Sequence, residues 1–225
     1  MRNPWLLLVG AICASAQTFS FGVKGGVPLT DLLAHSLQPP IFASSATNRY
    51  LVGPTVELHL PFGVSAELDV IYRHFGFTQS QSMQVFTPPN VLVSVFTATR
   101  TTGSDWEFPL LAKYRFRTSV VRPYLDSGIA WDLVGGSSTA TTTVFHLEPL
   151  GPPTTTTSTD GLGAQHDLAT GFVAGGGLEF HAGVLRIAPE IRFTRWFSQH
   201  FTTAADVGGM PSNRNQLEFL VGITF

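Results

Sequence analysis

The chain has 225 residues, and only 12% of them are charged, about half the share found in an ordinary soluble domain. Thirteen Lys and Arg residues stand against fifteen Asp and Glu residues, and this formal net charge of −2 argues against a polybasic nucleic-acid-binding protein. The mean hydropathy is positive, yet no long apolar run occurs, which excludes a transmembrane helix.

The first sixteen residues predict a secretory signal peptide. Arg2 precedes an apolar stretch, and residues 14–16 (Ala-Ser-Ala) form the small-residue pattern of a cleavage site. We therefore expect residues 1–16 to be removed and a single domain to occupy residues 17–225. The only cysteine, Cys13, would leave with the signal peptide, so the mature chain is expected to have no internal disulfide.

In eight later segments apolar and polar residues alternate, which predicts β-strands because successive side chains of a strand point to opposite faces. The clearest segment is the last one, where alternate residues from Leu217 to Phe225 are apolar and those between them include Glu218 and Thr224. Ten residues also match the length of a tilted strand that crosses a bilayer. In chain order the predicted strands are 19–27, 52–60, 64–72, 106–116, 122–132, 168–180, 185–197 and 216–225.

Short and long connections alternate between these segments. The short ones lie around residues 61–63, 118–119 and 181–183, and the four long ones cover about 28–50, 77–102, 134–165 and 198–215. All short turns therefore gather at one end of an up-and-down meander, as in outer-membrane barrels. We predict an all-β fold, an eight-stranded antiparallel up-and-down transmembrane β-barrel, which must close because lipid offers no hydrogen bonds to an open edge.

The distribution of charge predicts which face of the sheet points inward. A soluble barrel with an apolar interior would show the same alternation, but its outer surface would be expected to carry more charge than this chain has. If the polar face points inward, opposite charges can pair within a narrow lumen. We therefore expect ten acids to meet six bases inside the barrel: Glu57, Glu67, Asp69, Asp105, Glu107, Asp126, Asp132, Glu179, Glu190 and Glu218 with Lys24, Arg73, Lys113, Arg115, Arg186 and Arg192.

Five segments resemble the eight-stranded outer-membrane β-barrel domain family, in the form of a small porin-like barrel: FGVKGGVPLTD, RPYLDSGIAW, GGGLEF, RFTRWF and the ending LEFLVGITF. The likeness covers nearly all of the mature chain, and no periplasmic peptidoglycan-binding domain is expected after Phe225. The resemblance implies a cell outer membrane protein in contact with outer-membrane lipid. It also implies that the barrel-assembly machinery recognises the C-terminal strand ending at Phe225.

No residue pattern predicts a catalytic, cofactor-binding or metal site. The seven histidines lack H-E-x-x-H spacing, and no cysteine of the mature chain could join them. Ser65 and His74 would lie roughly 30 Å apart along an extended strand, too far for a catalytic pair. An Asp–His pair from different strands stays open as a protease site. We expect no enzymatic activity, no cofactor and no nucleic-acid partner.

Glycine and proline add two local expectations. The triplet 175–177 lacks the G-x-G-x-x-G spacing of a nucleotide site, and we expect it to make room for large side chains in the lumen. Pro109 and Pro189 interrupt predicted strands, and each predicts a β-bulge or a strand edge because proline has no N–H to donate.

Two of the long connections have distinctive compositions. Residues 134–165 include SSTATTT and TTTTST, for which a flexible polar tip, a hairpin extension beyond the membrane, and a sugar-modified or adhesive loop remain alternatives. Residues 28–50 are apolar for an exposed segment, and we expect a short helix folded onto the barrel mouth. The apolar residues of this segment are Leu29, Leu32, Leu33, Leu37, Ile41 and Phe42.

Two kinds of function remain open. The first is a monomeric structural or surface-interaction barrel that displays four external loops around a charge-filled lumen, without a large pore. An eight-stranded barrel has an interior only just wide enough for side chains, which favours this function. The second is a small-solute channel or an outer-membrane enzyme that modifies lipid or cleaves protein. The external ligand is not predicted.

Overall fold

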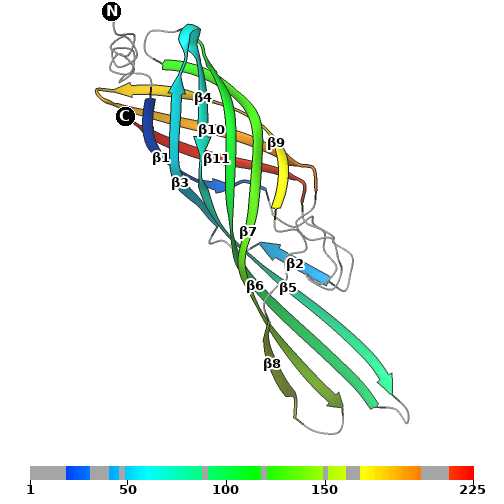
Figure 1. The fold of residues 1–225 in the computed structure, drawn as a ribbon. Coiled ribbons are helices and arrows are strands. Elements are labelled where there is room, and N and C mark those ends of the chain that lie inside the picture. The colour runs from blue at the N-terminus through cyan, green and yellow to red at the C-terminus, as the bar shows by residue number, and fades with distance from the viewer. Residues whose placement is uncertain are drawn as a thin grey trace, which may run out of the picture.

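A computed structural model describes residues 19–30, 41–45, 49–87, 91–117, 121–148, 152–160, 168–198 and 213–225. The predicted signal peptide lies outside these ranges. Eleven strands in the described part of the chain form one antiparallel sheet (Figure 1). The described residues include no helix that is long and apolar enough to cross a membrane.

Eight strands of this sheet close into a ring. In order around the ring they are β1, β3, the continuous pair β4 and β5, β6, β7, β9, β10 and β11, and β11 pairs again with β1. The closing pair places Val23 opposite Ile223. The predicted eight-stranded antiparallel barrel is thus confirmed. The bounds of all strands are β1 (Phe19–Pro28), β2 (Ile41–Ser45), β3 (Tyr50–His59), β4 (Val64–Asp69), β5 (Ile71–Thr87), β6 (Val91–Arg115), β7 (Val121–Glu148), β8 (Thr154–Asp160), β9 (Leu168–Ala182), β10 (Leu185–Trp196) and β11 (Asn215–Thr224).

Strands β4 and β5 form one strand of the barrel that is interrupted only at Val70. The register against β3 is the same on both sides of this residue, with Thr55 opposite Asp69 and Val52 opposite Tyr72. The Val70 N–H donates to the carbonyl of Pro54 at 3.0 Å, but Pro54 has no N–H to return. The interruption is therefore a missing hydrogen bond and not a change of direction.

The bulges predicted at Pro109 and Pro189 are wrong. Pro109 lies opposite Ala130 and Pro189 opposite Val221, with no change of register at either pair, and both strands have neighbours on two sides. The register shift between β6 and β7 lies instead between Gly103 and Asp105. A proline at these two positions removes a hydrogen bond without displacing the strand.

The short turns and the C-terminus lie at one end of the barrel. Phe21 and Phe225 exchange backbone hydrogen bonds of 3.0 and 3.4 Å there. The turn of residues 61–63 (η1) includes Gly63 with φ of 83°, and the β9–β10 turn includes Gly183 with φ of 67°. Glycine adopts this left-handed conformation without steric cost, which allows such tight reversals. By analogy with outer-membrane barrels, we refer to this end as periplasmic.

At the opposite end three strands continue far beyond the ring. Strand β5 runs to Thr87, β6 begins at Val91 and β7 runs to Glu148, while β2 pairs with β5 and β8 with β7. We call this part the projecting sheet: β2, β5 from Phe77, β6 up to Thr101, β7 from Thr139, and β8 (Figure 1).

The projecting sheet corrects two expectations about the long connections. The loop predicted at 77–102 is wrong for residues 77–87 and 91–102, which form the paired ends of β5 and β6, and residues 88–90 lie outside the described ranges. For the Thr-rich connection, the hairpin extension is confirmed where β7 pairs with β8. The helix expected in residues 28–50 is wrong for Ile41–Ser45, which form β2, and residues 31–40 lie outside the described ranges.

The two faces of the barrel follow the predicted alternation. On β11, Phe219 and Ile223 are 39% and 43% exposed, whereas Glu218 and Leu220 are 2% and 0% exposed. The apolar side chains thus form the outer face of the ring, and the charged ones point into the lumen. An apolar outer face around a closed ring is what the lipid interior requires.

Candidate functional site: the charged lumen

The lumen gathers nearly all the charged residues that the alternation assigned to it. All ten predicted acids are buried, none of them more than 4% exposed. Five of the six predicted bases are buried with them: Lys24, Arg73, Lys113, Arg115 and Arg192. Ten carboxyl groups thus share the barrel interior with five buried cationic groups. The five bases and eight of the acids form three clusters along the barrel axis.

The central cluster joins three cations to three carboxylates. The Lys24 ammonium from β1 lies 3.1 Å from Asp69 and 3.0 Å from Glu190, and it also donates to Glu67. The Arg192 guanidinium from β10 donates to Asp69 at 2.8 Å and to Glu190 at 2.8 Å. Lys113 from β6 donates to Glu67 as well. The ion pairs therefore connect four strands, β1, β4, β6 and β10. Thr55 on β3 donates to Asp69 and Tyr124 on β7 donates to Glu190, so two more strands join the network.

The outer cluster, toward the projecting sheet, is rich in acid. Arg73 donates to Glu107, to Glu218 at 2.8 Å and to the Gln216 side chain at 2.7 Å. Its guanidinium also lies 3.6 Å from the Asp105 carboxylate. Arg73 thus forms ion pairs with three carboxylates in this cluster.

The periplasmic cluster is centred on Arg115. Its guanidinium donates to both carboxylate oxygens of Glu57, to Glu179 at 2.7 Å and to the Ser65 hydroxyl at 2.7 Å. Such paired contacts with a carboxylate suit the planar fork of arginine. All three guanidinium nitrogens of Arg115 therefore donate within the lumen.

Arg186 differs from the expectation that it pairs with an acid of the lumen. It is only half-buried, and its Nη1 lies 2.9 Å from Nε2 of His59. Because the guanidinium can only donate, the imidazole Nε2 accepts in this contact. The alternation pattern placed Arg186 on the correct face but could not show that a histidine is its neighbour.

Small residues make room for this network, as expected for the glycine triplet. A Cβ at Gly175 would lie 2.5 Å from an Asp126 carboxylate oxygen, and one at Gly177 would lie 2.6 Å from the Tyr124 hydroxyl. Both contacts are shorter than van der Waals distance, so these two positions accept only glycine while their neighbours stay in place. The carboxylate of Asp126 is 4% exposed and has no hydrogen-bond partner among the described groups.

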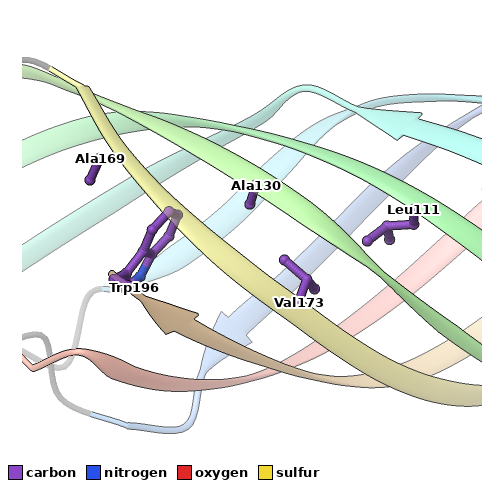
Figure 2. Close-up of a cluster of buried hydrophobic side chains, with 5 residues drawn as sticks. All are labelled: Leu111, Ala130, Ala169, Val173 and Trp196. Carbon is purple, nitrogen blue, oxygen red and sulfur yellow. The ribbon is translucent and has the colours of Figure 1, made fainter. Parts of the chain in front are cut away.

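Apolar side chains fill the parts of the lumen that the charged side chains do not occupy. One cluster on β6, β7, β9 and β10 contains Leu111, Ala130, Ala169, Val173 and Trp196 (Figure 2). A second cluster on β3, β5 and β11 contains Leu51, Ile71 and Leu220. Trp196 was not among the residues predicted to face the lumen. Its position two residues after Thr194 on the same face was the signal that would have placed it there.

The residues considered for catalysis do not come together. The Ser65 hydroxyl binds Arg115 in the lumen, whereas His74 stacks on Tyr50, with ring centroids 5.5 Å apart. In the described ranges, no group of three or more His, Cys, Asp and Glu residues has an arrangement that could hold a metal ion.

A closed ring of eight antiparallel strands with an apolar outside and an ion-paired inside defines an integral β-barrel protein of a bacterial outer membrane. The profile of the family described as "Outer membrane protein beta-barrel domain" matches residues 15–201, and the chain belongs to this family. Its location is accordingly the outer membrane. A search of curated proteins finds no match.

Three of the solved structures that align with the chain come from bacteria. Neisserial surface protein A aligns with 12% identity and a TM-score of 0.38, covering 92% of this chain and 95% of that one. The N-terminal β-barrel domain of Pseudomonas aeruginosa OprF aligns with 13% identity and a TM-score of 0.36, covering 92% and 98%. Ail, the attachment invasion locus protein of Yersinia pestis, aligns with 10% identity and a TM-score of 0.29, covering 92% and 97%.

Proposed function

We propose that this protein is a closed, non-conducting barrel that holds an interaction surface outside the cell. The observation that carries the proposal is the contrast between the ion-paired lumen of the barrel and the projecting sheet beyond it. The lumen is crossed by ion pairs between strands on opposite sides of the ring, such as Arg192 with Asp69 and Arg73 with Glu218. A water-filled channel would separate these groups, and each would then lose its buried partner.

The projecting sheet supports the proposal of an interaction surface outside the cell. Strands β5, β6 and β7 continue well past the ring, although spanning a membrane requires only about 9–11 residues per strand. The side chains of β8 that the structure describes are exposed threonine and serine. Extended strands of this kind provide a rigid surface that a flexible loop would not.

Two further parts of the proposal concern partners. The last strand, ending at Phe225, is the element through which the barrel-assembly machinery would recognise the chain. Its outer face, including Phe219 and Ile223, would contact lipid directly. Because β1 and β11 close the ring within a single chain, we expect the barrel to function as a monomer.

A trimmed barrel tests the surface function. The register places Gln79 opposite Thr99 and Thr141 opposite Ser158. Residues 80–98 and 142–157 can therefore each be replaced by Asn-Gly, a pair that suits a two-residue hairpin. The folded full-length and trimmed barrels are then applied in detergent to a glycan array and to a panel of purified extracellular proteins. Binding that only the full-length barrel shows is expected, and equal binding by both or by neither would contradict the proposal.

The alternative of an enzyme that modifies the membrane has a separate test. Expression of the barrel in a bacterial host, followed by mass spectrometry of lipid A, would reveal a mass shift if the barrel adds or removes an acyl chain. We expect an unchanged lipid A spectrum, because Ser65 and His74 lie on different faces and take part in other contacts.

A further inference from the structure

The periplasmic mouth of the barrel carries a concentration of positive charge that the ion pairs of the lumen do not use. The periplasmic cluster contains two carboxylates, Glu57 and Glu179, and both bind Arg115. Three further guanidinium groups lie at or near this mouth, those of Arg117, Arg122 and Arg186. Four guanidinium groups against two carboxylates leave an excess of two positive charges, whereas the outer cluster has an excess of acid.

Two of these arginines are available for a ligand. Arg117 and Arg122 flank the connection between β6 and β7, and both side chains are exposed. Neither guanidinium group makes a hydrogen bond or an ion pair with a residue that the structure describes. Arg122 lies opposite Glu179 in the β7–β9 pairing, but that carboxylate accepts from Arg115 and lies 3.5 Å from His181.

A cleft joins these arginines to the apolar outer face. It lies between the turn at 61–63 and the periplasmic ends of β6 and β7 and is open to solvent. One side of the cleft is polar and cationic and is formed by His59, Arg115, Arg117 and Arg122. The other side is apolar, and its residues Leu60, Val64 and Phe116 are 45%, 38% and 43% exposed on the outer face.

We propose that this cleft binds an anionic phospholipid of the periplasmic leaflet. The phosphate would lie between Arg117 and Arg122, because guanidinium groups bind phosphate through paired hydrogen bonds. The acyl chains would follow Val64 and Phe116 down the outer face of β4 and β6. The apolar side of the cleft distinguishes a lipid from a soluble phosphate, which would gain nothing from it. Short periplasmic turns keep the cleft at the level of the headgroups.

Native mass spectrometry of the full-length folded barrel tests the site, with phosphatidylglycerol titrated in a nonionic detergent. We expect one retained lipid per barrel. The double variant Arg117→Ala/Arg122→Ala should need about 30-fold more lipid for half occupancy, since each basic side chain near the headgroups contributes roughly tenfold or less. The matched control is Arg100→Ala, an exposed arginine of the projecting sheet, and it should bind like the unchanged barrel.

Two outcomes would overturn the proposal. The first is equal lipid retention by the double variant and the Arg100→Ala control, with both shown to be folded by heat-modifiable gel mobility. The second is occupancy of the site by glycerol phosphate at the concentrations that suffice for phosphatidylglycerol, which would make it a phosphate site without a role for the apolar side. The test does not depend on whether the projecting sheet has a partner.

Discussion

Lys24 and Glu190 lie 166 residues apart in the chain, yet their Nζ and Oε2 atoms are 3.0 Å apart in the middle of the barrel. Between their strands lies β11, which contributes Gly222 directly opposite Lys24. A Cβ at Gly222 would meet the aliphatic part of Lys24 at 3.5 Å. This is an ordinary van der Waals distance, so Lys24 extends across the neighbouring strand over Gly222 without crowding it. Contacts between strands that are not adjacent thus hold the lumen together.

Removal of one cation from the central cluster should destabilise the barrel strongly. Arg192 is fully buried and binds Asp69 and Glu190. Arg192→Ala leaves carboxylates without their partner, which should lower the free energy of unfolding by about 3–5 kcal/mol. The control is Arg195→Ala on the exposed side of the same strand, which should change it by about 0.5 kcal/mol or less. Denaturant unfolding in detergent measures both, and equal midpoints would contradict a dry, ion-paired lumen.

A charge on the lipid-facing side of β11 should interfere with assembly as well as stability. Val221 lies near the middle of the strand on the face of Phe219 and Ile223. Val221→Arg should cost about 2–4 kcal/mol if the residue lies at the bilayer midplane. Val221→Leu keeps the face apolar and should assemble normally. Heat-modifiable gel mobility after refolding into lipid vesicles reports the folded fraction, and full assembly of Val221→Arg would mean that this face does not meet lipid.

The substitutions Gly128→Ala and Gly222→Ala should have different effects on the stability of the barrel. A Cβ at Gly128 would lie 1.9 Å from the Leu110 carbonyl oxygen, whereas the nearest atom to a Cβ at Gly222 is 3.5 Å away. Gly128→Ala must displace backbone, so we expect a loss of about 1–3 kcal/mol. Gly222→Ala should be nearly neutral. Thermal unfolding followed by gel mobility compares them, and the reverse order of stability would contradict the register of β6 and β7.

Deletion of Phe225 should reduce barrel assembly. The Phe225 N–H donates to the carbonyl of Phe21 at 3.0 Å, at the point where the first and last strands meet. Its side chain is 67% exposed and thus available to the assembly machinery. Phe225→Tyr keeps an aromatic terminus and should assemble like the unchanged chain. The measurement is the folded fraction in outer-membrane preparations, and equal fractions for the deletion and the tyrosine variant would show that the terminal residue is not the signal.

The sequence predicted the part of the fold that lipid determines. An apolar residue at every second position is required where a strand meets lipid. The eight barrel strands and the inward position of Glu218 could therefore be predicted from the alternation within each strand. The ion-pair partners could not, because the pairing of Lys24 with Glu190 depends on how each strand is shifted against the next. The projecting sheet was missed between residues 77 and 102 because strands outside the membrane need no apolar face.

Planar-bilayer recording can show whether the ion pairs close the lumen. The full-length barrel, refolded and confirmed as folded by gel mobility, is inserted into a bilayer at high salt concentration and held at increasing voltages of both signs. We expect no steady opening, because the clusters around Lys24, Arg73 and Arg115 fill the interior together with Leu111, Trp196 and their neighbours. Long-lived openings of constant, large conductance from the folded barrel would contradict it.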